Sequence, residues 1–291
     1  MEGPQRVAFL GLGIMGWPMA ENLARAGFAL NVWTRDYAKA ERFAGEHGAS
    51  AEATPEEAAS GARAAISMVP DSPQVEAVLL GTGGAVHGLD PGALCIDMST
   101  IAPSASREIG GRLSEEDIAF LDAPVTGSRP KAEDGTLTIM VGGEPEPFDR
   151  ARGLLDRMGE LVIHVGPQGH GSMAKLINNT LAAVNAAALG EGLVLARAAG
   201  LDTDRLRQVL ASGSGSSAML ELKAAPMLEA SFEPLFKLEH MLKDLRHCLA
   251  EARALGIELP LAGVAEGLYA EAGEAGHAED DFAAVVTAIG G

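Results

Sequence analysis

Basic residues and cysteines are scarce in this sequence, and each of these two shortages argues against a class of protein. The 291 residues include 22 Lys and Arg against 40 Asp and Glu, which gives a formal net charge of −18. A chain this acidic lacks the basic face that nucleic acids require and is poorly suited to docking on an anionic membrane. With Cys95 and Cys248 as its 2 cysteines, it has no disulfide framework, and a reduced, cytoplasmic location is expected.

No uninterrupted apolar run reaches the roughly 18 residues of a membrane helix, so no spanning segment is expected. The apolar stretch near the N-terminus is broken by glycines and Glu21, so no signal peptide is predicted either. The chain does contain 47% hydrophobic residues and 36 glycines, but only 4% aromatics. This composition indicates a core of Ala, Leu and Val with close backbone approaches at glycines.

Short β-type runs alternate with helical segments through the first half of the chain. This alternation is typical of βαβ units around a mostly parallel sheet. The predicted strands are Arg6–Leu10, Ala29–Trp33, Ala64–Val69, Leu94–Met98, Ala119–Leu121, Thr136–Val141 and Leu161–Val165.

The pattern changes after Gly166-Pro167, where a long Ala/Leu-rich segment free of proline predicts one helix over Met173–Ala199. We therefore predict an α/β Rossmann domain with a doubly wound sheet over residues 1–166. An all-α substrate and dimerisation domain follows over residues 167–291 and begins with the long interdomain helix. The small residues of Leu181–Ala188 would let another helix approach closely, from the partner domain or from a second subunit.

A glycine motif follows the first predicted strand and precedes a helical run. It is the G-x-G-x-x-G pattern in its strand–turn–helix context, formed by Gly11, Leu12, Gly13, Ile14, Met15 and Gly16. The first glycine makes the tight turn, the second lets the backbone approach a pyrophosphate, and the third packs helix on strand. The motif therefore predicts a bound dinucleotide whose phosphates meet a helix N-terminus.

The end of the second predicted strand indicates which dinucleotide binds. An acid there would bind the ribose 2′-hydroxyl of NAD, whereas an arginine accommodates the 2′-phosphate of NADP. Thr34 stands where the acid is expected, Arg35 follows it, and Lys39 begins a helix. We predict that NADP(H) is preferred, with NAD(H) still possible because Asp36 lies next to Arg35.

Three further segments stand out, and together with the glycine motif they resemble the β-hydroxyacid dehydrogenase family. They are Asp97-Met98-Ser99-Thr100, Leu121–Ser128 with Ala132–Leu137, and Gly169–Asn179. The family includes 3-hydroxyisobutyrate dehydrogenases, tartronate-semialdehyde reductases and glyoxylate/succinic-semialdehyde reductases. The segments Ala132–Leu137 and Ala275–Val285 are most similar to the last of these branches.

The resemblance implies a role for individual residues. Lys175 matches the catalytic lysine, and the implied substrate-binding residues are Thr126, Gly127, Asn179, Phe236 and Asp244. Beside the glycine motif, Thr34 and Arg35, the implied cofactor contacts are Met68, Val69, Pro70, Thr100 and Lys243. The family's substrate turn is more usually Ser-Gly-Gly, so Ser128 departs from the second glycine.

Reducing an aldehyde requires a hydride and a proton for the developing alkoxide, and a lysine ammonium can supply that proton. The resemblance thus implies an NADPH-dependent reductase of glyoxylate or short semialdehydes, with a small anionic hydroxy acid or semialdehyde as substrate. An NAD(P)-dependent dehydrogenase of 3-hydroxyisobutyrate or a related 3-hydroxy acid is the alternative enzyme. The non-enzyme alternative is an NADP(H)-binding sensor or assembly module.

Other polar residues have simpler interpretations. His170 is a rival acid–base residue, but it lies between two glycines. His240 and His247 could suggest a metal, yet no further ligand pattern accompanies them, and no metal is expected. The acidic run Glu279-Asp280-Asp281 is interpreted as a solvated helix start. A homodimer or homotetramer is expected.

Overall fold

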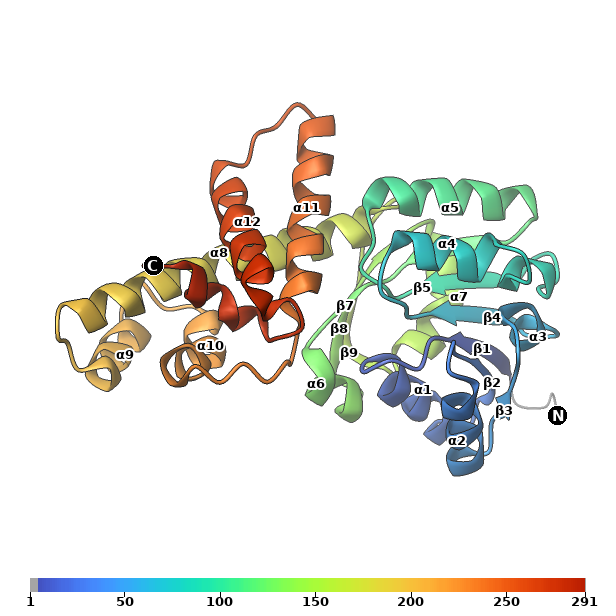
Figure 1. Ribbon diagram of the computed structural model, residues 1–291. Coiled ribbons are helices and arrows are strands. Elements are labelled where there is room, and N and C mark those ends of the chain that lie inside the picture. The colour runs from blue at the N-terminus through green and yellow to red at the C-terminus, as the bar shows by residue number, and fades with distance from the viewer. Residues whose placement is uncertain (1–4, 291) are drawn as a thin grey trace. The chain divides into compact units, whose positions relative to one another are not determined.

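The computed structural model describes residues 5–290. The chain divides into two compact units after Lys175, within a long helix (Figure 1). Each unit has its own hydrophobic core, and each is described in turn.

The first unit is a Rossmann fold built on a nine-stranded sheet, which confirms the predicted fold class. Its strand order is β3-β2-β1-β4-β5-β6-β8-β7, with β9 also paired to β8. The strands are β1 (Arg6–Leu10), β2 (Ala29–Trp33), β3 (Ser50–Ala51), β4 (Ala64–Ser67), β5 (Leu94–Asp97), β6 (Ala119–Asp122), β7 (Val125–Thr126), β8 (Leu137–Gly142) and β9 (Gly159–Gly166).

The sheet is parallel from β3 to β6, and then β8 runs antiparallel to both β6 and β7. The two-residue strands β3 and β7 were not predicted, because two residues are too short to show a period. Strand β9 returns the chain parallel to β8 and ends at Gly166, where the sequence pattern changes.

Helices cover both faces of this sheet, which explains why its strands are apolar on both sides. Along β1, Val7 and Phe9 enter the core beneath α1, α2 and α7, whereas Ala8 and Leu10 enter the core beneath α3, α4 and α5. Figure 1 shows α4 and α5 on the opposite side of the sheet from α1 and α2. The helical segments are α1 (Gly16–Arg25), α2 (Tyr37–His47), α3 (Pro55–Ala59), α4 (Ser72–Leu80), η1 (Ala85–His87), α5 (Pro103–Glu115), α6 (Ser128–Asp134) and α7 (Pro145–Leu155).

The second unit is helical and is organised around the later part of α8. Its core contains the largest fully buried side chain, Tyr269, together with Leu245 and Phe282. Helix α8 begins three residues earlier than predicted, at His170 rather than Met173, because glycines have low helix propensity and hid the first turn. The segments are α8 (His170–Ala198), α9 (Thr203–Ser212), α10 (Ala218–Glu229), α11 (Leu238–Ala254), α12 (Pro260–Ala272), η2 (Gly273–His277) and η3 (Phe282–Ala288).

One helix among the described residues, α8, is long and apolar enough to cross a membrane by length and composition alone. This test allows up to two charged residues in its window, so it differs from the uninterrupted apolar run that the sequence lacks. An 18-residue window of α8 has a mean hydropathy of 1.3. The same test is passed by core helices of globular proteins, and α8 supplies Ala183, Ala186 and Leu193 to the core of the second unit.

Candidate functional site

The glycine motif forms a tight, open turn between β1 and α1. Gly11 has φ 112°, and a Cβ there would overlap the Met68 carbonyl, while a Cβ on Gly16 would overlap the Gly11 carbonyl. A Cβ on Gly13, by contrast, would have no atom within 4 Å. No side chain caps the N-terminus of α1. This combination leaves backbone space and N–H groups for a phosphate, so the turn fits a dinucleotide.

The loops after β4 and β5, which carry Met68–Pro70 and Thr100, are joined by a buried carboxyl group. Asp97 Oδ1 accepts hydrogen bonds from the Ser67 hydroxyl at 2.7 Å and from the Ser99 N–H at 3.2 Å. Ser99 Oγ in turn accepts the N–H of Val69 at 3.0 Å. Burial raises the pKa of Asp97 to about 6, against the lowering effect of these hydrogen bonds. Asp97 therefore fixes two loops that were predicted to contact the cofactor.

The end of β2 lies against the glycine turn, because the Gly11 N–H donates to the Trp33 carbonyl at 2.8 Å. Thr34 is half-buried and Arg35 is exposed directly after it. Lys39 lies in the first turn of α2, with its Nζ 6.0 Å from the ring centroid of Trp17 on α1. Arg35 and Lys39 thus place two cations at the edge of the glycine turn, and no acid stands at position 34.

The turn after β6 is strained at the residue where the sequence departs from the family pattern. Gly127 has φ 135°, and a Cβ there would lie 2.7 Å from the Lys131 side chain. Ser128 follows with φ 57°, in the left-handed region that favours glycine. Thr126 and Gly127 are half-buried, whereas Ser128 is exposed. The second glycine of the family pattern therefore has a conformational reason, and this chain keeps the conformation with a serine.

Helix α8 is fixed at its first turn to the end of β6. The carboxylate of Asp122 accepts hydrogen bonds from the N–H groups of Gly169 and Ser172, at 2.8 and 2.6 Å. Lys175 follows one turn later and is 8% exposed. Long cationic side chains are rarely this buried, so its burial sets Lys175 apart from an ordinary surface lysine.

In the second unit, three of the implied site residues lie together. Asn179 on α8 donates through Nδ2 to Asp244 Oδ2 on α11 at 2.6 Å, and Lys243 Nζ is 3.1 Å from Asp244 Oδ1. Asp244 is fully buried and Asn179 is 5% exposed. Since the Asn179 amide also accepts from Asn178 Nδ2 at 3.1 Å, its orientation is set on both sides.

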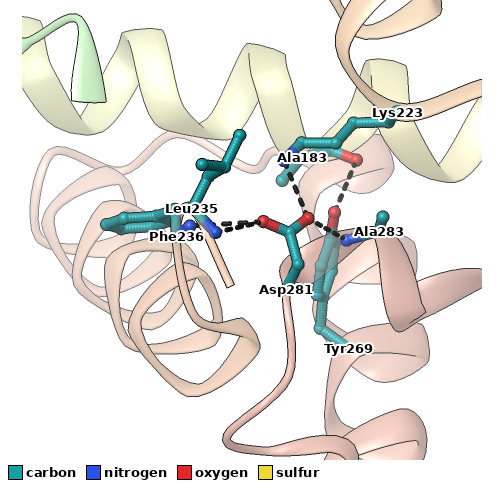
Figure 2. Close-up of polar contacts among 7 residues, drawn as sticks. All are labelled: Ala183, Lys223, Leu235, Phe236, Tyr269, Asp281 and Ala283. Carbon is teal, nitrogen blue, oxygen red and sulfur yellow. Dashed lines mark hydrogen bonds and ion pairs between the residues drawn. The ribbon is translucent and has the colours of Figure 1, made fainter. Parts of the chain in front are cut away.

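Phe236 is held at its backbone by Asp281, as Figure 2 shows. Asp281 Oδ2 accepts the N–H groups of Leu235 and Phe236, at 3.1 and 3.2 Å, while Oδ1 accepts from Lys223 Nζ at 2.7 Å. Asp281 also caps η3 through the Ala283 N–H, but it is only 2% exposed. The interpretation of Asp281 as a solvated helix start is therefore wrong about its exposure, because this carboxylate is a buried ion-pair partner.

Sequence reasoning missed Asp97, Asp122 and Asp281 as functional candidates. For Asp97 and Asp122 the available signal was their position, since each interrupts an apolar run, whereas Asp281 ends an acidic run and gave no such signal. Among residues 5–290 no group of three or more side chains could hold a metal ion. Burial raises the pKa of the Cys95 thiol to about 12, which leaves it protonated and unreactive.

Comparison with known proteins gives matches along nearly the whole chain. A family model of the NAD-binding domain of 6-phosphogluconate dehydrogenase matches residues 6–166. A second model, described as the NAD-binding region of NADP-dependent 3-hydroxyisobutyrate dehydrogenase, matches residues 169–289.

Individual relatives extend these matches. The chain is 37% identical over 284 residues to a 2-hydroxy-3-oxopropionate reductase of Escherichia coli, covering 98% of this chain and 97% of that one. It is 34% identical over 283 residues to glyoxylate/succinic semialdehyde reductase 1 of Arabidopsis thaliana, covering 97% and 98%. The structure of a 3-hydroxyisobutyrate dehydrogenase of Mycobacterium tuberculosis with L-serine aligns with TM-score 0.91 and 32% identity, covering 99% and 100%.

Proposed function

Since this chain belongs to the β-hydroxyacid dehydrogenase family of NAD(P)-dependent oxidoreductases, which act on CH–OH groups, we propose that it is an NADPH-dependent reductase. Its substrates are glyoxylate and short semialdehydes, which it converts to the corresponding hydroxy acids. The buried Lys175, one turn from the helix start that Asp122 anchors, is the observation that carries this proposal. The dinucleotide belongs to residues 1–166, and residues 167–291 contribute to substrate binding and to dimerisation.

The glycine turn, with Gly11 to Gly16, would hold the pyrophosphate, and Met68–Pro70 and Thr100 would also contact the dinucleotide. The nicotinamide supplies the hydride when it is bound. In the second unit, Lys243, paired with Asp244 at 3.1 Å, is the further cofactor contact that the family resemblance implies. The protein is expected in the cytoplasm, because its low cysteine content is typical of proteins in a reducing compartment.

Lys175 stabilises the developing alkoxide and then transfers a proton from Nζ to that oxygen. As the carbonyl carbon gains a C–H bond, the C=O π electrons move to the oxygen and the new O–H bond forms at the expense of an N–H bond of the ammonium. The neutral amine regains its proton from water. Asn179 lies one turn further along α8, on the same face of the helix. Its amide, oriented by Asp244, holds the substrate next to Lys175.

The substrate carboxylate is bound by the turn at Thr126 and Gly127. The Thr126 hydroxyl and the backbone N–H groups of this turn bind an anion without a formal charge. This matters in a chain of net charge −18, where an anionic substrate meets an unfavourable overall field. Phe236 and Asp244 complete the substrate-binding set.

NADPH is preferred over NADH because Thr34 stands where an acid would bind the ribose 2′-hydroxyl, and Arg35 and Lys39 follow it with two positive charges. In the variant Arg35→Asp, we expect the NADPH:NADH ratio of kcat/KM to fall by about 10- to 100-fold, the range of one charge-assisted hydrogen bond. The exposed Arg157, far along the chain, gives the control Arg157→Asp, which should leave the ratio unchanged. An unchanged ratio in Arg35→Asp would refute the assignment of NADPH.

The catalytic assignment is tested by turnover. Glyoxylate, succinic semialdehyde and 3-hydroxyisobutyrate are assayed with both cofactors, for the wild type, Lys175→Ala and the control Glu191→Gln on an exposed position of α8. We expect reduction of the aldehydes by the wild type and loss of kcat by about 1,000-fold or more in Lys175→Ala, with NADPH affinity retained. Full activity of Lys175→Ala would refute Lys175 as the proton donor.

A second candidate function is oxidation of 3-hydroxyisobutyrate or a related 3-hydroxy acid. It is favoured by the 3-hydroxyisobutyrate dehydrogenase structure with TM-score 0.91. The same panel separates the two, because a 3-hydroxyisobutyrate dehydrogenase would show its highest kcat/KM in the oxidative direction with that substrate.

We also propose that the second unit forms the interface of a homodimer or homotetramer. Large apolar side chains on α8 and α12 are exposed, with Leu181 at 60%, Leu195 at 70% and Leu261 at 72%. Exposed apolar residues in this number are typical of a surface covered by a second copy. Light scattering should give a multiple of the 30.0 kDa chain mass, and the variant Leu181→Glu should lower it.

A further inference from the structure

The first turn of α8 depends on a single buried side chain, Asp122. Its Oδ1 accepts from the Gly169 N–H and from Gln168 Nε2, both at 2.8 Å, and its Oδ2 accepts from the Ser172 N–H at 2.6 Å. Asp122 itself is fully buried. Charge-assisted bonds of this length are the stronger class of protein hydrogen bond. They fix the helical register just before Lys175.

The helix also touches the sheet backbone with no side chain between them. A Cβ on Gly171 would lie 2.5 Å from the Met140 carbonyl oxygen, and a Cβ on Gly142 would lie 2.5 Å from Asp122 Oδ1 and 2.7 Å from the Gly171 nitrogen. Such close approaches leave no room for the first turn to shift toward the sheet. The first turn of α8 is therefore held by the Asp122 carboxylate and by direct contact with the backbone of β6 and β8.

The same residue begins the segment that leads to the substrate turn. After Asp122 the chain continues through Pro124, whose carbonyl accepts the Met140 N–H at 3.0 Å. It then forms β7, in which Thr126 pairs with Thr138 of β8. Asp122 itself pairs with Gly142 of β8. Asp122 is thus connected, within the first unit, both to the turn at Thr126 and to the start of the helix that carries Lys175.

We propose that Asp122 is a positioning residue that sets the distance between the carboxylate-binding turn and the proton-donating amine. This inference rests on the proposed role of Lys175. The carboxylate is fully buried and accepts from Gln168, Gly169 and Ser172, so it acts on the reaction through the position of Lys175. Burial raises the pKa of Asp122, against the lowering effect of its N–H donors.

The test compares Asp122→Asn with a matched helix-capping variant. An amide at this position must place an NH2 group against N–H donors, so at least one of the bonds to Gly169 or Ser172 is lost. Asp202 caps α9 by accepting the N–H groups of Asp204 and Arg205, each at 3.0 Å, and α9 carries no site residue. Asp202→Asn is therefore the control.

Rates are expressed per NADPH-binding site, titrated by the quenching of nicotinamide fluorescence. We expect Asp122→Asn to keep its full number of NADPH sites and its NADPH affinity. Its kcat should fall by about 100-fold with a smaller change in KM, which is the loss expected when a catalytic group is displaced by about 1 Å. Asp202→Asn should retain wild-type kcat. A purely structural role would instead lower the number of binding sites and leave the rate per site unchanged, and that result would overturn the proposal.

A double-mutant cycle separates this inference from the function on which it rests. If Asp122 acts through Lys175, then Asp122→Asn should add little to the defect of Lys175→Ala, because the group it positions is already gone. Additive defects would refute the positioning role while Lys175 stays the proton donor. Wild-type activity of Lys175→Ala would instead refute the proposed function. If Asp122→Asn fails to fold, the variant Gln168→Ala takes its place, because it keeps the Asp122 carboxylate and removes one of its donors. We expect Gln168→Ala to lower kcat by about tenfold. An unchanged kcat would contradict the inference.

Discussion

Removing the carboxylate of Asp281 should destabilise the second unit more than removing its ion-pair partner Lys223. Asp281 accepts four hydrogen bonds from three segments of the chain, whereas Lys223 contributes one of them (Figure 2). Both side chains are buried, at 3% and 4% exposure. The two substitutions therefore leave behind different uncompensated groups.

The asymmetry can be worked out from these contacts. Asp281→Ala leaves a buried ammonium without its anion and three backbone N–H groups without an acceptor, so we expect a loss of about 3–5 kcal/mol in the free energy of unfolding. Lys223→Met leaves a carboxylate that still accepts the N–H groups of Leu235, Phe236 and Ala283. Its methionine can also pack on the Phe282 ring, over which Lys223 Nζ lies 4.1 Å from the centroid. We expect a loss of only about 1–2 kcal/mol.

Urea unfolding followed by far-UV circular dichroism measures both losses, at one protein concentration so that any oligomerisation is held constant. The double variant completes the cycle and gives the coupling energy of the pair. Because Asp281 holds the backbone of Phe236, Asp281→Ala should also raise KM for the aldehyde substrate at low urea. Equal losses for the two single variants, or a larger loss for Lys223→Met, would refute the idea that Asp281 is the anchor and Lys223 its counter-ion.

Two further predictions concern the first unit. The pKa of Asp97 is about 6 in the folded protein against an ordinary 3.8, so the folded state holds this proton more tightly than the unfolded chain. Stability should therefore fall as pH rises from about 4 to 6, by about 3 kcal/mol from this group. In Asp97→Asn, which keeps an acceptor for Ser67 and Ser99, unfolding measured across that range should show a flatter profile, and an unchanged profile would contradict the assignment. For the turn, Ser128→Gly relieves a positive φ and should alter the free energy of unfolding by less than about 1 kcal/mol, since the relief offsets the added flexibility of the unfolded chain. Gly127→Ala should cost more than that, and the reverse order in thermal unfolding would refute the strain argument.

Much of the fold could be predicted from the sequence because the first unit follows local rules. The two faces of β1 carry apolar residues alternately, and β1 and β2 end where the sequence pattern ends, at Leu10 and Trp33. The change after Gly166-Pro167 to a long Ala/Leu-rich segment free of proline likewise predicted the helical unit. The antiparallel return through β7 and β8 was not predictable in this way, because pairing between Val125 and Ile139 is a non-local choice.

The site was predictable where a motif has a fixed geometry and not where it depends on tertiary contacts. The glycine motif required its strand, turn and helix, and all three are present. Asp122 and Ser172, by contrast, are 50 residues apart in sequence, and Asp281 meets Lys223 across 58. No local pattern predicts which distant residue such an aspartate meets. The acidic run at residues 279–281 misled for this reason, since Glu279 is exposed and Asp281 is buried.

The buried aspartates also explain how a chain of net charge −18 can maintain a site for anions. The carboxylates of Asp97, Asp122, Asp244 and Asp281 are each met by hydrogen-bond donors at 2.6–2.8 Å. These donors are backbone N–H groups, hydroxyls, an amide and an ammonium, so the acids act as fixed acceptors inside the fold rather than as a negative surface facing the substrate. Apart from the buried Glu251, the other acidic side chains among the described residues are half-buried or exposed, where ions screen their charge within about 8–10 Å. These four acids thus hold loops and helices of their own units in place, and the excess of acidic residues is compatible with an anionic substrate.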